Sequence, residues 1–216
     1  MNFKEKKPID PKKRLLIIIG IVVIVIVLLF AVSYAIDTYY KSRDNNAPKP
    51  IDFDFFPVNY KENIYDDEDY TTLIKDGFIS YTDGATGVTI GINTDNLQKY
   101  GVEVEFMVDY IYTIINGDAD AYNAFFTAQY FKNNKKHERF TMQKLYDVNI
   151  TKLAVNDVGG NTVYEFTLEY KILENNGTFR NDIGDGSKKQ YITVTTENGK
   201  LLISSISTAN FAVNKK

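Results

Sequence analysis

The chain contains one uninterrupted alternation of apolar and polar residues, Tyr164-Glu165-Phe166-Thr167-Leu168-Glu169-Tyr170-Lys171-Ile172. Successive side chains of a β-strand point to opposite faces, so this pattern predicts a strand with one buried face and one solvated face. Strands of this kind are typical of antiparallel sheets that pack on a core from one side. The fold is therefore expected to contain an antiparallel sheet.

The segments that flank this strand have the same period of two. Residues 146–155 alternate as well, but their apolar positions change parity near Thr151-Lys152, which predicts a β-bulge and a bent strand. After a long loop over residues 174–187, two further strands are expected within residues 189–207. They are joined by Asn198-Gly199, which is the strongest short-range signal for a β-hairpin.

Upstream of the sheet the apolar residues recur with the period of a helix. This helix is expected to begin after residues 93–96, whose side chains can cap it. Its apolar face has the i, i+3, i+4, i+7 spacing and consists of Val104, Met107, Val108, Ile111 and Ile115. Asn116-Gly117 is expected to end this helix, and a second helix is expected over residues 121–131. Because Phe106, Tyr110 and Ile114 widen the apolar face, the first helix has to be covered on more than one side.

An additional β-hairpin is expected before the helices. Residues 78–81 and 88–92 are rich in residues that favour strands, and the turn signals Asp83-Gly84 and Thr86-Gly87 lie between them. These glycines do not belong to a phosphate-binding loop, because no Gly-Lys-Ser or Gly-Lys-Thr follows and the next element is a strand.

The N-terminal region predicts one transmembrane helix over residues 15–36. This segment would be ~33 Å long as a helix, which is enough to cross a hydrocarbon core of roughly 30 Å. Residues 1–14 hold six basic and two acidic residues and carry a net charge of +4, so the remainder carries −7 of the total of −3. This asymmetry places the N-terminus in the cytoplasm and the C-terminal part outside. Cleavage after Ala35 is the alternative, but signal-peptide apolar regions are roughly 7–15 residues and the run of residues 15–32 is longer.

Residues 37–76 are expected to form a solvated tether between the membrane and a domain over residues 77–208, which a short tail over residues 209–216 follows. The tether holds ten acidic and five basic residues. Within it, the aromatic residues Phe53, Phe55 and Phe56 allow two readings. They form an interaction motif that docks on a partner, or they pack back onto their own domain.

Composition excludes several classes of chemistry. The chain has no cysteine and a single histidine, so disulfides, thiolate catalysis and cysteine-ligated zinc are excluded, and we expect no metal and no other cofactor. The acidic exterior argues against a nucleic-acid partner, because neutralising phosphates requires clustered lysine and arginine. No catalytic constellation is found, and His137 is expected in a polar surface loop.

One segment resembles the start of a known fold: Phe106-Met107-Val108-Asp109-Tyr110-Ile111-Tyr112-Thr113-Ile114-Ile115-Asn116-Gly117-Asp118-Ala119-Asp120-Ala121-Tyr122. It is similar to the opening of nuclear transport factor 2-like (cystatin-like α+β) domains, where a helix ends in a Gly-Asp turn and the next helix follows at once. The resemblance covers residues 101–207. It implies an α+β fold in which a helix pair packs on a curved antiparallel sheet, with the predicted hairpin as an addition.

The resemblance also implies two classes of function. Some members of that superfamily are isomerases and dehydratases with a pocket between helices and sheet, and such a pocket would place Asp109, Tyr110 and Tyr112 as ligand-binding residues. The alternative is that Asp109 is solvated and the tyrosines belong to the core or its rim. Other members are assembly domains, such as the bitopic inner-membrane subunit of type IV secretion and conjugation machines, which this chain resembles in layout.

The sequence therefore favours a single-pass membrane protein that is not an enzyme. Its extracytoplasmic domain is expected to act through protein contacts, with a protein partner or as a homo-oligomer, in an envelope, conjugation or secretion complex. A small-molecule-binding or enzymatic pocket is the alternative, and a passive spacer is a third reading.

Overall fold

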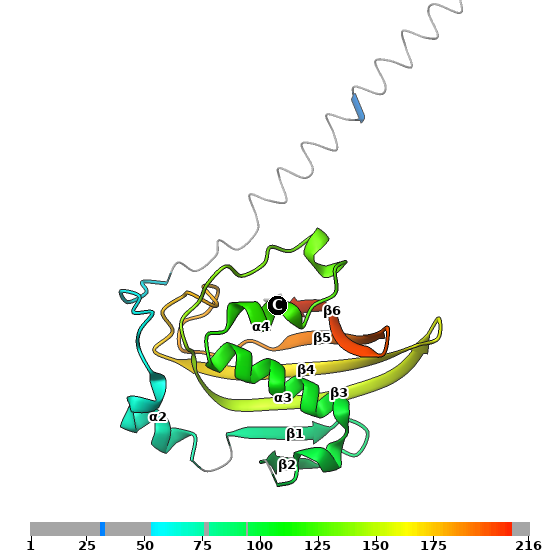
Figure 1. The fold of residues 1–216 in the computed structure, drawn as a ribbon, viewed down its shortest axis with the longest axis horizontal. Helices are drawn as coiled ribbons and strands as arrows, with labels where there is room; N and C mark the ends of the chain where they lie inside the picture. The colour runs from blue at the N-terminus through cyan, green and yellow to red at the C-terminus, as the bar shows by residue number, and fades with distance from the viewer. Residues whose placement is uncertain (1–30, 33–52, 76–77, 94, 209–216) are drawn as a thin grey trace, which may run out of the picture. The chain divides into compact units, whose positions relative to one another are not determined.

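The computed structural model describes residues 31–32, 53–75, 78–93 and 95–208. The chain divides into two compact units, residues 1–50 and residues 51–216, and all strands of the described residues belong to the second (Figure 1). The predicted cytoplasmic tail, all but two residues of the predicted transmembrane helix and the C-terminal tail lie outside the described residues. Within the described ranges, no helix has the length and apolar character needed to cross a membrane.

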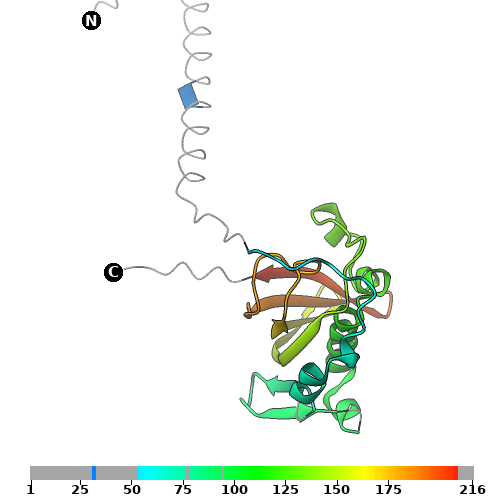
Figure 2. The same cartoon turned by 90° about the vertical axis from the view of Figure 1, so that its left-hand side faces the viewer.

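The second unit is an α+β domain in which three helices pack against a six-stranded mixed sheet. In the order β2-β1-β3-β4-β5-β6, the strands are Thr89–Ile92, Ile79–Asp83, Lys144–Val158, Asn161–Leu173, Gln190–Glu197 and Lys200–Thr208. The helices are α2 (Glu68–Leu73), α3 (Val102–Ile115) and α4 (Ala119–Ala124), with short 3-10 turns between several elements. All three helices lie on one face of the sheet, which does not close into a barrel (Figures 1 and 2).

Helix α3 lies across the sheet and carries the centre of the core. The side chains that it buries are Val104, Met107, Val108, Tyr110, Ile111, Thr113, Ile114 and Ile115. They belong to the same core as the buried face of strand β4, where Phe166, Leu168, Tyr170 and Ile172 are buried, as the alternation of that strand predicts. The buried residues of α3 lie on several sides of the helix, which agrees with the prediction that it must be covered on more than one side.

Helix α4 is shorter than the predicted helix over residues 121–131. It ends at Ala124, because the next residues turn to β6 for their hydrogen bonds. The Ile203 amide donates to the Phe125 carbonyl at 2.7 Å, and the Thr127 amide donates to the Ile203 carbonyl at 3.0 Å. This bridge holds residues 125–127 along the sheet edge, and a 3-10 turn follows at Tyr130–Lys132.

The sheet departs from the antiparallel prediction at one pairing. Strands β1 and β2 form the predicted antiparallel hairpin, but β1 runs parallel to β3, with Ile79 opposite Val148. The chain between them includes both α3 and α4, and a crossover of that length allows parallel pairing, whereas a tight turn does not. The sheet is therefore mixed.

Two local predictions for the strands are confirmed. The register of β3 against β4 shifts between Lys152 and Ala154, next to the predicted bulge, and it shifts again between Tyr146 and Asn149. Asn198 and Gly199 both adopt positive φ, at 52° and 75°, as a two-residue type I′ hairpin turn requires.

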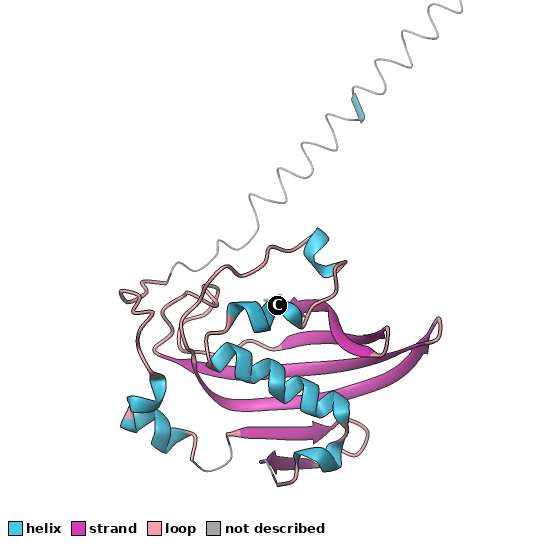
Figure 3. Cartoon of the chain, viewed as in Figure 1, coloured by secondary structure: helices cyan, strands magenta, loops and turns pink. Residues whose placement is uncertain are grey.

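Residues 53–75, which lie within the predicted tether, belong to the folded domain (Figure 3). Ile64 and Tyr70 are buried in the core, and the Tyr70 hydroxyl donates to the Leu145 carbonyl at 2.9 Å. The acidic residues between them take structural positions, since Asp67 caps α2 by accepting a hydrogen bond from the Tyr70 amide. We call residues 53–75 the strap.

Gly117, in the turn between α3 and α4, is expected to be required for this packing. It has φ +66°, and a Cβ atom there would lie 2.7 Å from the Met142 amide nitrogen. Gly117→Ala should cost the ~1–2 kcal/mol of a left-handed residue plus ~1–3 kcal/mol of overpacking, measured by denaturant unfolding. Gly159→Ala is the matched control, because Gly159 has φ +62° and open space around it. Equal losses for the two variants would contradict the close approach.

Candidate functional site

The three predicted ligand residues do not converge on one cavity. Asp109 and Tyr112 are three positions apart, so they lie on the same side of α3, and both are exposed. Tyr110 lies on the opposite side and is fully buried. Its hydroxyl donates to the Tyr122 hydroxyl at 3.3 Å, and burial raises the pKa of Tyr110 well above its ordinary value, which keeps the phenol neutral.

Aromatic rings occupy the space between α3, α4 and the sheet. The Tyr110 and Tyr122 ring centroids are 5.4 Å apart, and Tyr122 packs edge-on against Phe140 at 5.7 Å and Phe179 at 5.4 Å. Phe126 stacks on Tyr130 at 4.3 Å. These contacts are those of a packed core.

His137 belongs to this aromatic cluster and is not a solvated loop residue. Its ring stacks on Phe179 at a centroid distance of 5.4 Å and is half-buried. The Asn123 side chain fixes the loop, since it donates to the His137 carbonyl at 2.7 Å and accepts from the His137 amide at 3.1 Å. Burial lowers the pKa of His137, which favours the neutral imidazole.

The exposed side of α3 borders an apolar groove. The groove has a volume of about 510 Å³ and is lined by residues of β1, β2 and α3 and of the segments next to them, including the two residues after α2: Ile74, Lys75, Phe78, Ile79, Gly91, Ile92, Asn93, Leu97, Val108 and Tyr112. Tyr112 is 41% exposed, and its ring lies 6.4 Å from that of Phe78. Among the described lining residues Lys75 is the one that carries a charge, and most of the others have apolar side chains.

Two carboxylates stand beside this groove on α3. Glu105 and Asp109 are one turn apart, on the same stripe as Tyr112, and within the described part of the chain neither forms an ion pair. Partial burial, and then the nearby Glu105 carboxylate, raise the pKa of Asp109. Like charges at this spacing repel each other, so a cation placed here would be favoured.

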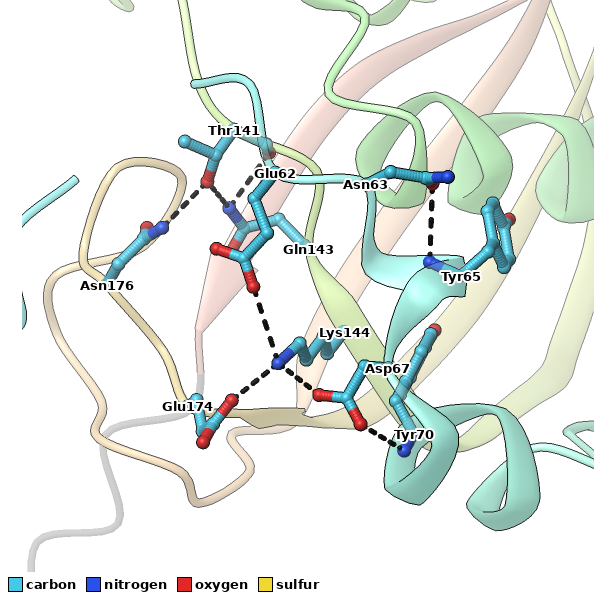
Figure 4. A network of polar contacts seen from close by, with 10 residues as sticks. All are labelled: Glu62, Asn63, Tyr65, Asp67, Tyr70, Thr141, Gln143, Lys144, Glu174 and Asn176. Atoms are coloured by element: carbon cyan, nitrogen blue, oxygen red, sulfur yellow. Dashed lines mark hydrogen bonds and ion pairs between the residues drawn. The ribbon is translucent and has the colours of Figure 1, made fainter. Parts of the chain in front are cut away.

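A second polar cluster lies at the start of β3 (Figure 4). The Lys144 side chain is only 8% exposed, and its ammonium group lies 2.6 Å from Asp67 Oδ2, 2.5 Å from Glu174 Oε2 and 3.6 Å from Glu62 Oε1. Burial alone would lower the pKa of Lys144, but the hydrogen bonds to Asp67 and Glu174 raise it above its ordinary value. The ammonium group therefore stays charged and is not a free nucleophile.

This cluster fixes the strap to the sheet. Glu62 and Asp67 belong to the strap, Lys144 to β3 and Glu174 to the loop after β4. The hydrogen bond of Lys144 lowers the pKa of Asp67, so the pair is ionised at neutral pH. A small hollow of about 200 Å³ lies beside the cluster, but Lys144 already engages the two carboxylates that line it.

The three aromatic residues at the start of the strap differ in their contacts with their own domain. A Cβ atom built on Gly177 would touch the Phe55 ring at 2.6 Å, and one built on Gly184 would touch the Phe53 ring at 3.3 Å. These two rings therefore lie on the loop between β4 and β5 of their own domain. Phe56 is exposed and lines the hollow beside Lys144.

The described residues contain no group of three or more histidine, cysteine, aspartate or glutamate side chains that could hold a metal ion. Among the described residues that line the apolar groove there is no carboxylate and no histidine. The apolar side chains of the described lining offer contact area for an apolar side chain.

The sequence analysis singled out Tyr112 but missed the rest of the groove and the Lys144 cluster. The groove lining comes from four separate segments, and only the tertiary fold brings them together.

Comparisons of the chain with models of known protein families, with curated proteins and with solved structures find no match.

Lys144→Met is expected to lower the free energy of unfolding by about 1–2 kcal/mol, because the variant loses two charge-assisted hydrogen bonds whose carboxylates are partly solvated. Denaturant unfolding measures this. The control is Lys171→Met, which removes an exposed pair with Asp147 at 2.7 Å and should have little effect. Equal effects would show that the cluster does not hold the strap.

The domain should lose stability as the pH falls below about 6.5, because burial lowers the pKa of His137 and the unfolded chain protonates this residue before the folded chain does. His137→Phe keeps a ring against Phe179 and should remove this part of the pH dependence. Urea unfolding at several pH values tests it. The same slope in both proteins would contradict the burial of a neutral imidazole.

Proposed function

We propose that residues 15–36 anchor the chain in a membrane and that the domain binds another protein on the outer side. The apolar run and the positive charge of residues 1–14 support this topology. The nuclear transport factor 2-like class is part of the proposal, because the α3–α4 pair with its Gly117-Asp118 turn, packed on a bent strand, fits that class.

The apolar groove beside α3 is the observation that carries the binding function. Exposed apolar surface that is concave and rimmed by polar residues is typical of protein interaction sites. Tyr65 and Leu73, on the adjacent strap, are exposed large apolar side chains as well. Burying such side chains against a partner would contribute roughly 25 cal/mol for each Å² of apolar surface removed from water.

The alternative is a small-molecule pocket between helices and sheet, and it has less support. Such a pocket needs an open cavity with a polar group placed for binding or proton transfer. The corresponding volume is occupied by the rings of Tyr110, Tyr122 and Phe126, and Asp109 points away from it.

A photo-crosslinking amino acid at Tyr112, in the full chain in intact cells, tests the binding function. We expect discrete protein adducts from this position, because a partner side chain would occupy the groove. Tyr191 is the matched control, since it is 40% exposed and lies on the opposite face of the sheet. Adducts with lipid only, or the same adducts from both positions, would contradict the proposed binding function.

A further inference from the structure

We infer that the groove beside α3 receives residues 209–216 of a second copy of this chain, an inference that rests on the proposed docking function. The groove offers a mainly apolar cleft with Lys75 in its lining, and next to it are the carboxylates Glu105 and Asp109, which form no ion pair within the described part of the chain. A matching ligand therefore carries an apolar side chain followed by a basic one. Residues 209–216 have this order, with Phe211 and Val213 before Lys215-Lys216.

The segment leaves the domain at the edge of the sheet farthest from the groove. Strand β6 ends at Thr208, and five strand spacings separate it from β2 along one row of paired residues: Thr208, Gln190, Leu168, Ile150, Tyr81 and Ile90. Neighbouring strands lie ~4.8 Å apart, so the path along the sheet is ~24 Å. Three residues reach at most ~11 Å, so Phe211 cannot enter the groove of its own domain.

A neighbouring copy removes this obstacle. In the proposed topology, two copies in one membrane display their domains on the same side, which raises the local concentration of each segment at the other's groove. Residues 37–43 also combine aromatic and basic side chains, but they follow the proposed membrane span, where such residues are typical of the interface.

The contact joins two different surfaces, so it is heterologous. A heterologous contact continues from copy to copy and forms rings or open chains, whereas an isologous contact stops at the dimer. The side-chain amide of Asn96 donates to the outward Gly91 carbonyl at 2.9 Å and blocks part of the β2 edge. The segment is therefore held by side chains in the groove and not by a full added strand.

The test places a photo-crosslinking residue at Phe211 in the full chain, reconstituted in liposomes from a mixture of isotope-labelled and unlabelled copies. We expect adducts between copies at the groove residues Ile92, Leu97 and Tyr112, and a ladder that extends beyond the dimer. Tyr112→Lys should lower the adduct yield about tenfold, and Tyr191→Lys should leave it unchanged. Asp109→Lys should also lower the yield, and the added changes Lys215→Glu and Lys216→Glu should restore it.

Three results would overturn the inference: adducts within one copy, adducts on another surface, or a yield that Tyr112→Lys does not change. The proposed function is tested separately by the crosslinks from Tyr112 in intact cells. Crosslinks from Tyr112 to a different protein, with none to residues 209–216, would remove this segment as the occupant and leave the docking function standing.

Discussion

A helix that is apolar around most of its circumference has to be covered on several sides, and the arrangement of this domain follows from that constraint on α3. The sheet covers one side, and the rings of α4 and its following loop cover a second. The strap and the β1–β2 hairpin cover a third side only in part. The groove is the part of that side which remains open, and Tyr112 stands at its border.

The Lys144 cluster bears on the groove because it positions the strap. Lys144 and the Tyr70 hydroxyl hold α2 against β3, and Ile74 and Lys75, at the end of α2, form part of the groove wall. A buried ammonium group is costly unless it is paired, and this one faces carboxylates from two other segments. The geometry of the candidate site thus depends on a charge cluster outside it.

Much of the fold could be predicted from the sequence because its signals are local. The alternation of residues 164–172, the parity change near Thr151-Lys152 and the Asn198-Gly199 turn each act within a few residues. The parallel pairing of β1 with β3 could not be predicted in this way, since it depends on where a crossover of two helices returns. The strap was missed because its acidic composition resembles a linker, although Asp67 serves as a cap and an ion-pair partner.

The candidate site was predicted only in part for the same reason. Asp109, Tyr110 and Tyr112 were predicted as ligand residues from a resemblance, and the structure places Asp109 and Tyr112 on the exposed stripe of α3 and Tyr110 in the core. Helical spacing could not show that Phe78, Ile92 and Leu97 would join Tyr112 from other elements. Sequence patterns fix the direction in which a side chain points along its own element, and the tertiary fold decides what it meets.

The central claim is that a protein covers the groove in the cell, and the absence of cysteine from the chain allows a direct measurement. Tyr112→Cys and Tyr191→Cys each introduce a single thiol, which a membrane-permeant maleimide labels in intact cells and in the purified chain. Position 112 should be labelled much more slowly in cells than in the purified chain diluted in detergent to its monomer, while position 191 should be labelled equally in both. Equal labelling of position 112 in both settings would contradict the claim.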